Sequence, residues 1–411
     1  MTVGTPSSSG DADLALRRRT EEIGTALQSA VNALLASIQH GGARGQKSLQ
    51  LALQIGQSAV SRLSSAVRSG DPLITLGMIP GQLVLGQMLK GAARSGVDPA
   101  CLARVAEAVR QFDDFVEREF GDRAALDTLL SEWVFESRAA FELRQKAAAF
   151  KSMSALRGVQ ADLVLSTGIV YPGSDGAAHD GMGVEVLLGC RRLKPSGRLR
   201  LNFSSLDPNE SRYQPHSLAG TPVGGMRELL VPEFSTVRDS QIASVRQGRV
   251  IETSVTGLPL GKTQGRGDDI VYAQVYNGVH RARRGAGSPT SGMASHAEPP
   301  AQCCVIDALL HDDVWPGIEP QLRLYDTVVR GIAHPDDPVR FNDRLDMVES
   351  VQSLGRGVAA LRLPEFVRYP ELIAHLCALR GWDAGALRAY RVKIRYPIYG
   401  SQIGMAFVLP D

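Results

Sequence analysis

Residues 49–63 read LQLALQIGQSAVSRL, and the spacing of their apolar residues predicts two short helices joined by a tight turn. Such a pair packs through apolar side chains on the inner face of each helix and one in the turn, which holds the second helix at a steep angle to the first. The residues in those positions are Leu49, Leu53, Ile55, Val60 and Leu63. The spacing therefore predicts a helix-turn-helix.

The outer face of the second predicted helix carries short polar side chains and guanidinium groups. These residue types bond to base edges and to phosphates in a DNA groove. The predicted DNA-binding residues are Lys47, Gln57, Ser58, Ser61, Arg62, Ser65 and Arg68. The alternative for the same segment is a helical hairpin inside an all-α domain that makes no contact with DNA.

The run VSRL at 60–63 and the apolar spacing around it resemble bacterial helix-turn-helix transcriptional regulators over residues 46–69. More loosely, the run DPL at 71–73 and the long helical segment that follows resemble a family of bacterial helix-turn-helix proteins whose function is not established. The resemblance implies a sequence-specific regulator that binds double-stranded DNA. Because the DNA sites of such regulators are two-fold symmetric, a homodimer is the expected form.

Positive charge is concentrated around this motif, although the formal net charge of the whole chain is only +2. Residues 16–94 contain nine basic and three acidic residues, whereas residues 95–150 contain seven basic and eleven acidic ones. A local excess of positive charge favours contact with phosphates. A solvated helix surface is the alternative explanation for the same charges.

The first part of the chain is predicted to be helical. Residues 1–13 are rich in Ser, Gly and Asp and are expected to form a disordered tail. Helical spacing then extends over 14–158, with two longer helices at 105–120 and 126–150. After the motif, Asp71 is suited to cap a new helix and Pro72 to occupy its first turn. The apolar face of the first helix consists of Leu27, Val31, Leu34, Leu35 and Ile38.

Near Val159 the apolar period changes from helical to two-fold, which predicts a β-rich domain over 159–411. A helix is expected at 364–379, and a flexible loop is expected at 285–300, where Gly, Ser, Pro and Ala are crowded together. The predicted strands are 161–171, 184–188, 199–203, 250–255, 270–276, 303–309, 322–329, 390–396 and 404–409.

The predicted fold class is therefore α+β. An all-α helix-turn-helix domain is followed by a mainly antiparallel β domain, a sandwich or a barrel, with one or two helices. The pattern leaves open whether 159–411 is one domain or two. No apolar run approaches the roughly 18 residues that a membrane span needs, and the first residues lack the apolar core of an export signal. The expected compartment is the cytoplasm.

A search for catalytic and metal-binding patterns finds no complete set. The five cysteines include no C-x-x-C spacing, which argues against a zinc site or a disulfide framework. Cys303 and Cys304 are expected to be buried thiols on a strand, with a redox switch as the alternative. Residues 257–263 read GLPLGKT, but three residues separate the glycines where a P-loop has four.

The histidines are far apart in the sequence. The runs HD at 179–180 and HDD at 311–313 are expected to be polar turns, with a metal or catalytic role as the alternative. No nucleophile elbow, kinase pattern or dinucleotide fingerprint is present. The sequence therefore predicts a protein that is not an enzyme and that has no metal site and no cofactor.

The leading hypothesis is a DNA-binding transcriptional regulator whose β-rich domain senses a small-molecule effector of unknown identity or mediates oligomerisation. The alternative is a non-enzymatic protein-interaction or assembly protein, whose N-terminal helices bind another protein. An enzyme housed in the β-rich domain is a third possibility. A DNA-binding protein loses affinity steeply as salt rises, because phosphate contacts release counterions, whereas an apolar protein contact does not.

Overall fold

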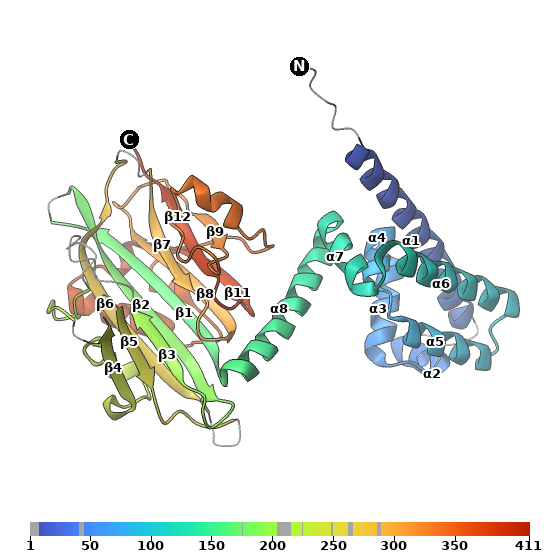
Figure 1. Cartoon of the computed structure of the whole chain (residues 1–411), viewed down its shortest axis with the longest axis horizontal. Coiled ribbons are helices and arrows are strands. Elements are labelled where there is room, and N and C mark those ends of the chain that lie inside the picture. Colours follow the sequence, from blue (N-terminus) through green and yellow to red (C-terminus); the bar gives the residue numbers. More distant parts are fainter. Residues whose placement is uncertain are drawn as a thin grey trace, which may run out of the picture. The chain divides into compact units, whose positions relative to one another are not determined.

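The computed structural model describes residues 8–40, 45–174, 176–203, 215–223, 225–247, 250–261, 266–285 and 289–411. The chain forms two compact units, Met1–Glu142 and Leu143–Asp411. Helices make up the first unit and β-sheets most of the second (Figure 1). The predicted α+β class, with a helical region followed by a mainly antiparallel β region, is confirmed.

The helices of the first unit alternate with short turns. Asp71 accepts hydrogen bonds from the backbone N–H groups of Leu73 and Ile74, with Pro72 at the first helical position, so the predicted cap is confirmed. The helices are α1 (Ser8–His40), α2 (Gln46–Leu53), α3 (Gln57–Arg68), α4 (Pro72–Met78), α5 (Gln82–Arg94), α6 (Pro99–Phe120) and α7 (Arg123–Trp133), and α8 (Phe135–Arg157) continues into the second unit.

One apolar core joins these helices. The predicted face of α1 is buried in it, and Leu27, Val31 and Leu34 have no exposed surface. The same core contains side chains from α2 through α7. Because α1 packs along α6, α4 and α3, it holds the short helices of the motif against the longer ones.

Two predictions about the helical unit were wrong. The helix α1 begins at Ser8, so the disordered tail predicted over 1–13 is wrong for residues 8–13; residues 1–7 lie outside the described residues. The helix predicted over 126–150 is broken at Val134, whose backbone is extended (φ −135°, ψ 114°). Val134 is buried in the core, so the break brings an apolar side chain inward.

The second unit is built on a six-stranded sheet in the order β10-β11-β8-β1-β2-β6. The strand β1 pairs with β2 antiparallel and with β8 parallel, and the other neighbours are antiparallel. The strands are β1 (Val159–Pro172), β2 (Ala178–Arg192), β6 (Asp268–Arg281), β8 (Ala301–His311), β10 (Gln352–Arg356) and β11 (Leu387–Arg395).

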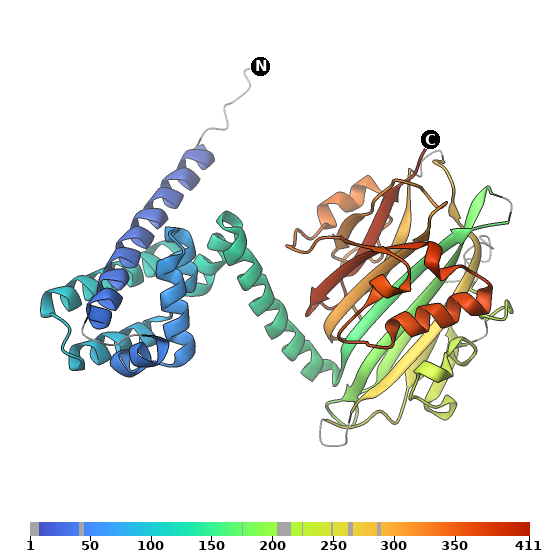
Figure 2. The same cartoon turned by 180° about the vertical axis from the view of Figure 1, so that it is seen from behind.

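Both faces of this sheet are covered. On one face lies the helix α9 (Tyr369–Arg380), which is in front in Figure 2. Two three-stranded sheets cover the other face, which is in front in Figure 1. Their strand orders are β7-β12-β9 and β3-β5-β4, with the bounds β7 (Thr290–His296), β12 (Gln402–Val408), β9 (Gln321–Tyr325), β3 (Leu199–Phe203), β5 (Val250–Val255) and β4 (Ile242–Gln247).

The alternation of side chains along β1 produces these layers. Leu163 and Leu165 pack with α9, whereas Val164 and Val170 pack toward the three-stranded sheets. The layers stack face to face, as in a sandwich. The 3₁₀ helices of this unit are η2 (Met226–Leu229), η3 (Pro232–Phe234), η4 (Asp239–Gln241), η5 (Pro338–Asp343), η6 (Val358–Leu361) and η7 (Ala384–Ala386).

Cys303 and Cys304 are buried on β8, as predicted. Three other predictions for this unit need correction. The loop expected over 285–300 is wrong for Thr290–His296, which form β7 by pairing with β12; residues 286–288 lie outside the described residues. The strand expected over 322–329 ends at Tyr325, because the Asp326 carboxylate accepts the Val328 N–H and turns the chain. The helix expected from 364 begins five residues later, at Tyr369.

Across the described part of the chain, no single helix has the length and apolar composition of a membrane span; α4 and α5, bent by 94° at their junction, meet that test only as a pair.

Candidate nucleic-acid interface

The two helices of the motif are joined at Gln54, Ile55 and Gly56. Gln54 is left-handed (φ 54°, ψ 36°) and ends α2, and Gly56 is extended (φ −64°, ψ 152°) and begins α3. Between them the Ile55 side chain is buried. The chain therefore turns between the two helices over three residues, around one apolar side chain, which is the kind of connection that a helix-turn-helix requires.

The apolar residues predicted for the inner faces are all buried. Their exposed fractions range from 0% for Leu53, Val60 and Leu63 to 5% for Ile55. All belong to the core of the helical unit. The prediction of two helices that pack through these residues is confirmed, and the opposite side of α3 faces solvent.

The seven predicted DNA-binding residues differ in how far their side chains are exposed to solvent. Gln57, Ser58, Arg62 and Arg68 on α3 are exposed, and so is Lys47 on α2. The remaining two, Ser61 and Ser65, are only partly exposed. A DNA groove would therefore meet the first turn of α3 and its exposed arginines before it reached the two half-buried serines.

Arg62 is engaged within the protein. Its Nε donates to the Met78 carbonyl (3.1 Å) and its Nη2 to the Ile79 carbonyl (3.5 Å), at the C-terminal end of α4. Arg123 donates from Nη2 to the carbonyls of Leu76 and Ile79 at the same end. Two cations thus satisfy carbonyls that lack partners inside the helix, where the helix dipole favours positive charge. The spacing of the motif indicates that Arg62 is exposed, but it contains no signal for this contact.

The helix α5 supports the turn, although sequence analysis did not single out its residues. Arg94 Nη1 donates to Gln54 Oε1 (2.8 Å), and Ser95 Oγ donates to the Ala52 carbonyl (2.8 Å). Gly91 lies directly against the backbone of Leu53. These contacts hold the C-terminal end of α2 in place, and they therefore help to fix the position at which α3 begins.

Apart from Arg62, the described basic residues of 16–94 divide into two groups. On α1, the arginines form ion pairs: Arg17 with Glu21 (3.2 Å), Arg18 with Glu22 (3.3 Å) and Arg19 with Glu119 (2.8 Å). The second group forms no ion pair with any described residue and consists of Lys47, Arg68, Lys90 and Arg94. The positive charges on α1 are therefore neutralised by neighbouring carboxylates, whereas those on α2, α3 and α5 form no ion pair with a described residue. Arg44 lies outside the described residues.

His179 and His311 of the β unit belong to the two runs for which the sequence left a metal or catalytic role open. His311 Nδ1 accepts the Asp313 N–H (3.2 Å), which is a local turn of the kind expected there. The polar turn expected over 179–180 is wrong, because both residues lie on β2; His179 is buried there, and burial lowers its pKa. Within the described ranges, no group of three or more His, Cys, Asp or Glu side chains could hold a metal ion.

One carboxyl of the β unit titrates near neutral pH. Glu185 on β2 is only partly exposed, accepts a hydrogen bond from Ser166 Oγ, and lies in a polar cluster with Ser295, whose Oγ is 2.7 Å from that of Ser166. Burial raises the pKa of Glu185 to about 7, against the smaller opposite effect of the Ser166 bond. The cluster is therefore neutral below pH 7 and negatively charged above it.

Replacing Glu185 by Gln is expected to change the pH dependence of stability. The folded pKa is above that of an unfolded Glu, so the stability that Glu185 contributes is present below about pH 4.5 and is lost as the pH rises through 7. The free energy of unfolding of E185Q relative to wild type should therefore increase between pH 4.5 and 7.5. Urea denaturation at a series of pH values measures this difference, and a difference that is constant with pH would refute the assignment.

Comparison with known proteins identifies no family. No family model matches the sequence, and no curated protein matches it. Among solved structures, a putative protease from Parabacteroides distasonis aligns with 62% of this chain and 41% of its own, at 10% identity and a TM-score of 0.28. The yeast delta-COP-I mu-homology domain, complexed with a Dsl1 WxWxV peptide, aligns with 62% of this chain and 76% of its own, at 10% identity and a TM-score of 0.15. Likenesses this weak support no conclusion about fold or function.

Proposed function

We propose that this chain is a sequence-specific DNA-binding transcriptional regulator and that α3 is its reading helix. The observation that carries the proposal is the division of α3 into a fully buried apolar side and a solvent side with Gln57, Ser58 and Arg68 exposed. The uncompensated charges of Lys47, Arg68, Lys90 and Arg94 lie on the same three helices, α2, α3 and α5. A major groove accepts one helix with this composition, and the flanking phosphates require these charges.

The residues of this interface would have two roles, contact with phosphates and contact with base edges. Lys47 and Arg68 would contact phosphates and fix the position of the protein on the duplex. Gln57 and Ser58, in the first turn of α3, would contact base edges, since a glutamine amide matches the donor and acceptor of adenine. Arg62 would act chiefly by holding α4 against α3. A homodimer in the cytoplasm remains the expected form, because two copies match a two-fold site.

A second candidate is a protein-interaction module. It is favoured by Leu51 on α2 and Leu83 on α5, whose exposed fractions are 73% and 78%. Exposed leucines of this kind suit an apolar partner surface. The two candidates differ in their response to salt, because only the phosphate contacts are coupled to counterion release.

Selection of bound duplexes from a random pool, with the full-length chain, tests the proposal. On a selected site, Gln57→Ala is expected to cost about 1–3 kcal/mol of binding free energy and to relax the preference at one base pair. Lys47→Ala should weaken binding to all sequences alike and reduce the salt dependence by about one counterion. Both positions are exposed, so folding should be unaffected. Arg62 is a poor choice for this test, because its removal also breaks the contacts with α4.

The matched control is Gln111→Ala, since Gln111 is an exposed glutamine of α6, a helix that carries none of the proposed contacts. It should leave both affinity and specificity unchanged. Failure to recover any preferred sequence, or affinity that does not depend on salt, would reject the DNA proposal in favour of a protein partner.

A further inference from the structure

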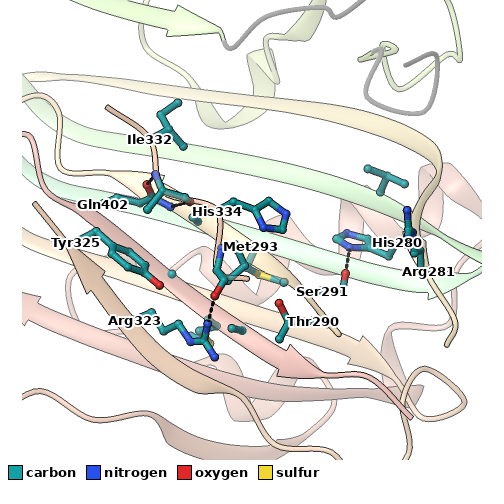
Figure 3. Close-up of a pocket in the computed structure, with 18 residues that line it drawn as sticks. His280, Arg281, Thr290, Ser291, Met293, Arg323, Tyr325, Ile332, His334 and Gln402 are labelled. Carbon is teal, nitrogen blue, oxygen red and sulfur yellow. Dashed lines mark hydrogen bonds between the residues drawn. The ribbon is translucent and has the colours of Figure 1, made fainter. Parts of the chain in front are cut away.

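A pocket of about 320 Å³ lies in the β unit, beside the sheet β7-β12-β9 (Figure 3). Its lining comes from four separate parts of the chain: the end of β6, the strand β7, the segment from β9 to Pro335, and β12. The volume lies at the lower end of the range for small-molecule sites, which are often built from several segments of one fold.

The floor of the pocket is made of very small residues. Gly404 on β12 pairs with Ala294 on β7, and Ala406 pairs with Gly292. Because alternate residues of a strand share a face, these four lie together on one face of the sheet. Met405 and Phe407, which alternate with them, belong to the core on the other face. None of these four residues has a side chain larger than a methyl group, so the floor can accommodate a planar apolar group of a ligand.

The wall opposite the floor is formed by residues 332–335, and hydrogen bonds hold it in a fixed position. Ala333 donates its N–H to Gln402 Oε1 (2.7 Å) and accepts at its carbonyl from Gln402 Nε2 (2.9 Å). Arg323 Nη1 donates to the Pro335 carbonyl. Below this wall, the buried Arg340 donates to the Gly331 carbonyl (2.7 Å). The pocket is therefore preformed, and a ligand would not need to order it.

Tyr325 supplies a polar group that is not satisfied by the protein. Its side chain is 2% exposed and lines the pocket, and its hydroxyl makes no hydrogen bond with any residue that the structure describes. Figure 3 shows the Tyr325 ring extending from β9 beside Arg323. Buried hydroxyl groups nearly always have a partner, so a ligand atom that accepts a hydrogen bond would complete this site.

The charge of the lining favours an anion. Arg281 and Arg323 line the pocket, and none of the described lining residues is acidic. The nearby Asp336 is engaged outside the lining, where its carboxylate accepts from the Thr290 N–H and hydroxyl. The two bonds of Arg323, to Pro335 and Gln321, use two of the five N–H donors of a guanidinium. Arg323 and Tyr325 are two residues apart on β9 and so point the same way.

We propose that this pocket binds a small planar organic acid, with its ring on the floor of Gly292, Ala294, Gly404 and Ala406 and its carboxylate between Arg323 and the Tyr325 hydroxyl. The guanidinium would supply the charge-assisted bond and the hydroxyl a second donor. The proposal does not depend on DNA binding, because every residue that it uses belongs to the β unit.

Direct titration of the full-length chain tests this proposal. The probes are benzoate, 2-naphthoate and indole-3-acetate, each compared with its neutral primary amide by calorimetry. At least one acid is expected to bind, and its amide should bind at least about tenfold more weakly, since the charge-assisted bond is lost. Tyr325→Phe should weaken binding of that acid about fivefold to tenfold, since the hydroxyl donor is lost.

Ala294→Leu supplies a second, independent variant. Ala294 is exposed on the floor, so the larger side chain should fill the pocket without disturbing the core and should abolish binding. Its matched control is Ala243→Leu, at an exposed position on β4, which should bind as wild type does. The proposal is overturned if no acid binds, if acids and amides bind equally, or if a folded A294L chain binds as tightly as wild type.

Discussion

Replacing Asp307 by Ala is expected to lower the free energy of unfolding of the β unit by about 3–5 kcal/mol, because it leaves a buried cation unpaired. Asp307 on β8 is 0% exposed. Its Oδ1 accepts from Arg391 Nε (2.8 Å), and its Oδ2 accepts from Arg391 Nη2 (2.7 Å) and from the Tyr369 hydroxyl (2.9 Å). The Tyr369 hydroxyl in turn lies 2.8 Å from Thr167 Oγ1.

The network ties two layers of the β unit together, since Asp307 and Arg391 lie on adjacent strands of the six-stranded sheet and Tyr369 begins α9. Without the carboxylate, the bonds of Arg391 to described residues are those to the carbonyls of Leu361 (3.3 Å) and Arg362 (2.9 Å). Its charge would then be buried without a counterion, which is the costly arrangement.

Two variants distinguish this explanation from a general loss of packing. The double variant Asp307→Leu, Arg391→Met removes both charges and should recover most of the loss, because apolar residues of similar volume replace a buried pair at little cost. The exposed Asp239→Ala should change stability by less than about 0.5 kcal/mol. Urea denaturation measures all three. A double variant that is no more stable than D307A would show that charge burial is not the cause.

Gly91→Ala is expected to destabilise the helical unit by about 1–3 kcal/mol, because the added methyl group has no space. A Cβ at this position would lie 2.2 Å from the carbonyl oxygen of Leu53 and 2.4 Å from its carbonyl carbon. The obstacle is backbone rather than a flexible side chain, so α5 and α2 must move apart. This loss outweighs the gain of about 1 kcal/mol that Ala normally gives over Gly inside a helix.

Gly86 on the same helix provides a control with the opposite sign. A Cβ there would have no described atom within 4 Å apart from the adjacent residues and backbone of α5 itself, so Gly86→Ala should stabilise the unit by about 0.5–1 kcal/mol through helix propensity alone. Thermal unfolding of both variants, followed by the helical circular dichroism signal, compares them. Equal shifts of the same sign would show that α5 does not pack on Leu53 as closely as described.

Local signals explain the parts of the fold that sequence analysis predicted. The cap of α4 depends on Asp71 and Pro72 alone, and the inner faces of α2 and α3 follow from apolar spacing within fifteen residues. The buried strands β1, β2 and β8 contain long apolar runs that need no partner to be recognised.

The parts that were missed depend on partners far along the chain. The strand β7 reads TSGMASH and has no apolar alternation; it is a strand because β12 pairs with it, and Gly292 allows the close approach, since a Cβ there would lie 2.1 Å from the Met405 carbonyl oxygen. The bonds of Arg62 to the end of α4 span sixteen and seventeen residues of sequence. The pocket gathers residues from four segments, so no single stretch contains its pattern.

The parallel pairing of β1 with β8 has a consequence for synthesis of the chain. Ala161 of β1 pairs with Ala301 of β8, 140 residues later, and such distant pairings form slowly. The helical core is complete at Val134, so the first unit can fold while the ribosome is still making the second. Until β8 emerges, one edge of β1 has unpaired backbone groups beside Leu163 and Leu165. An open apolar edge is a template for aggregation, and we expect a nascent chain at this stage to bind chaperones.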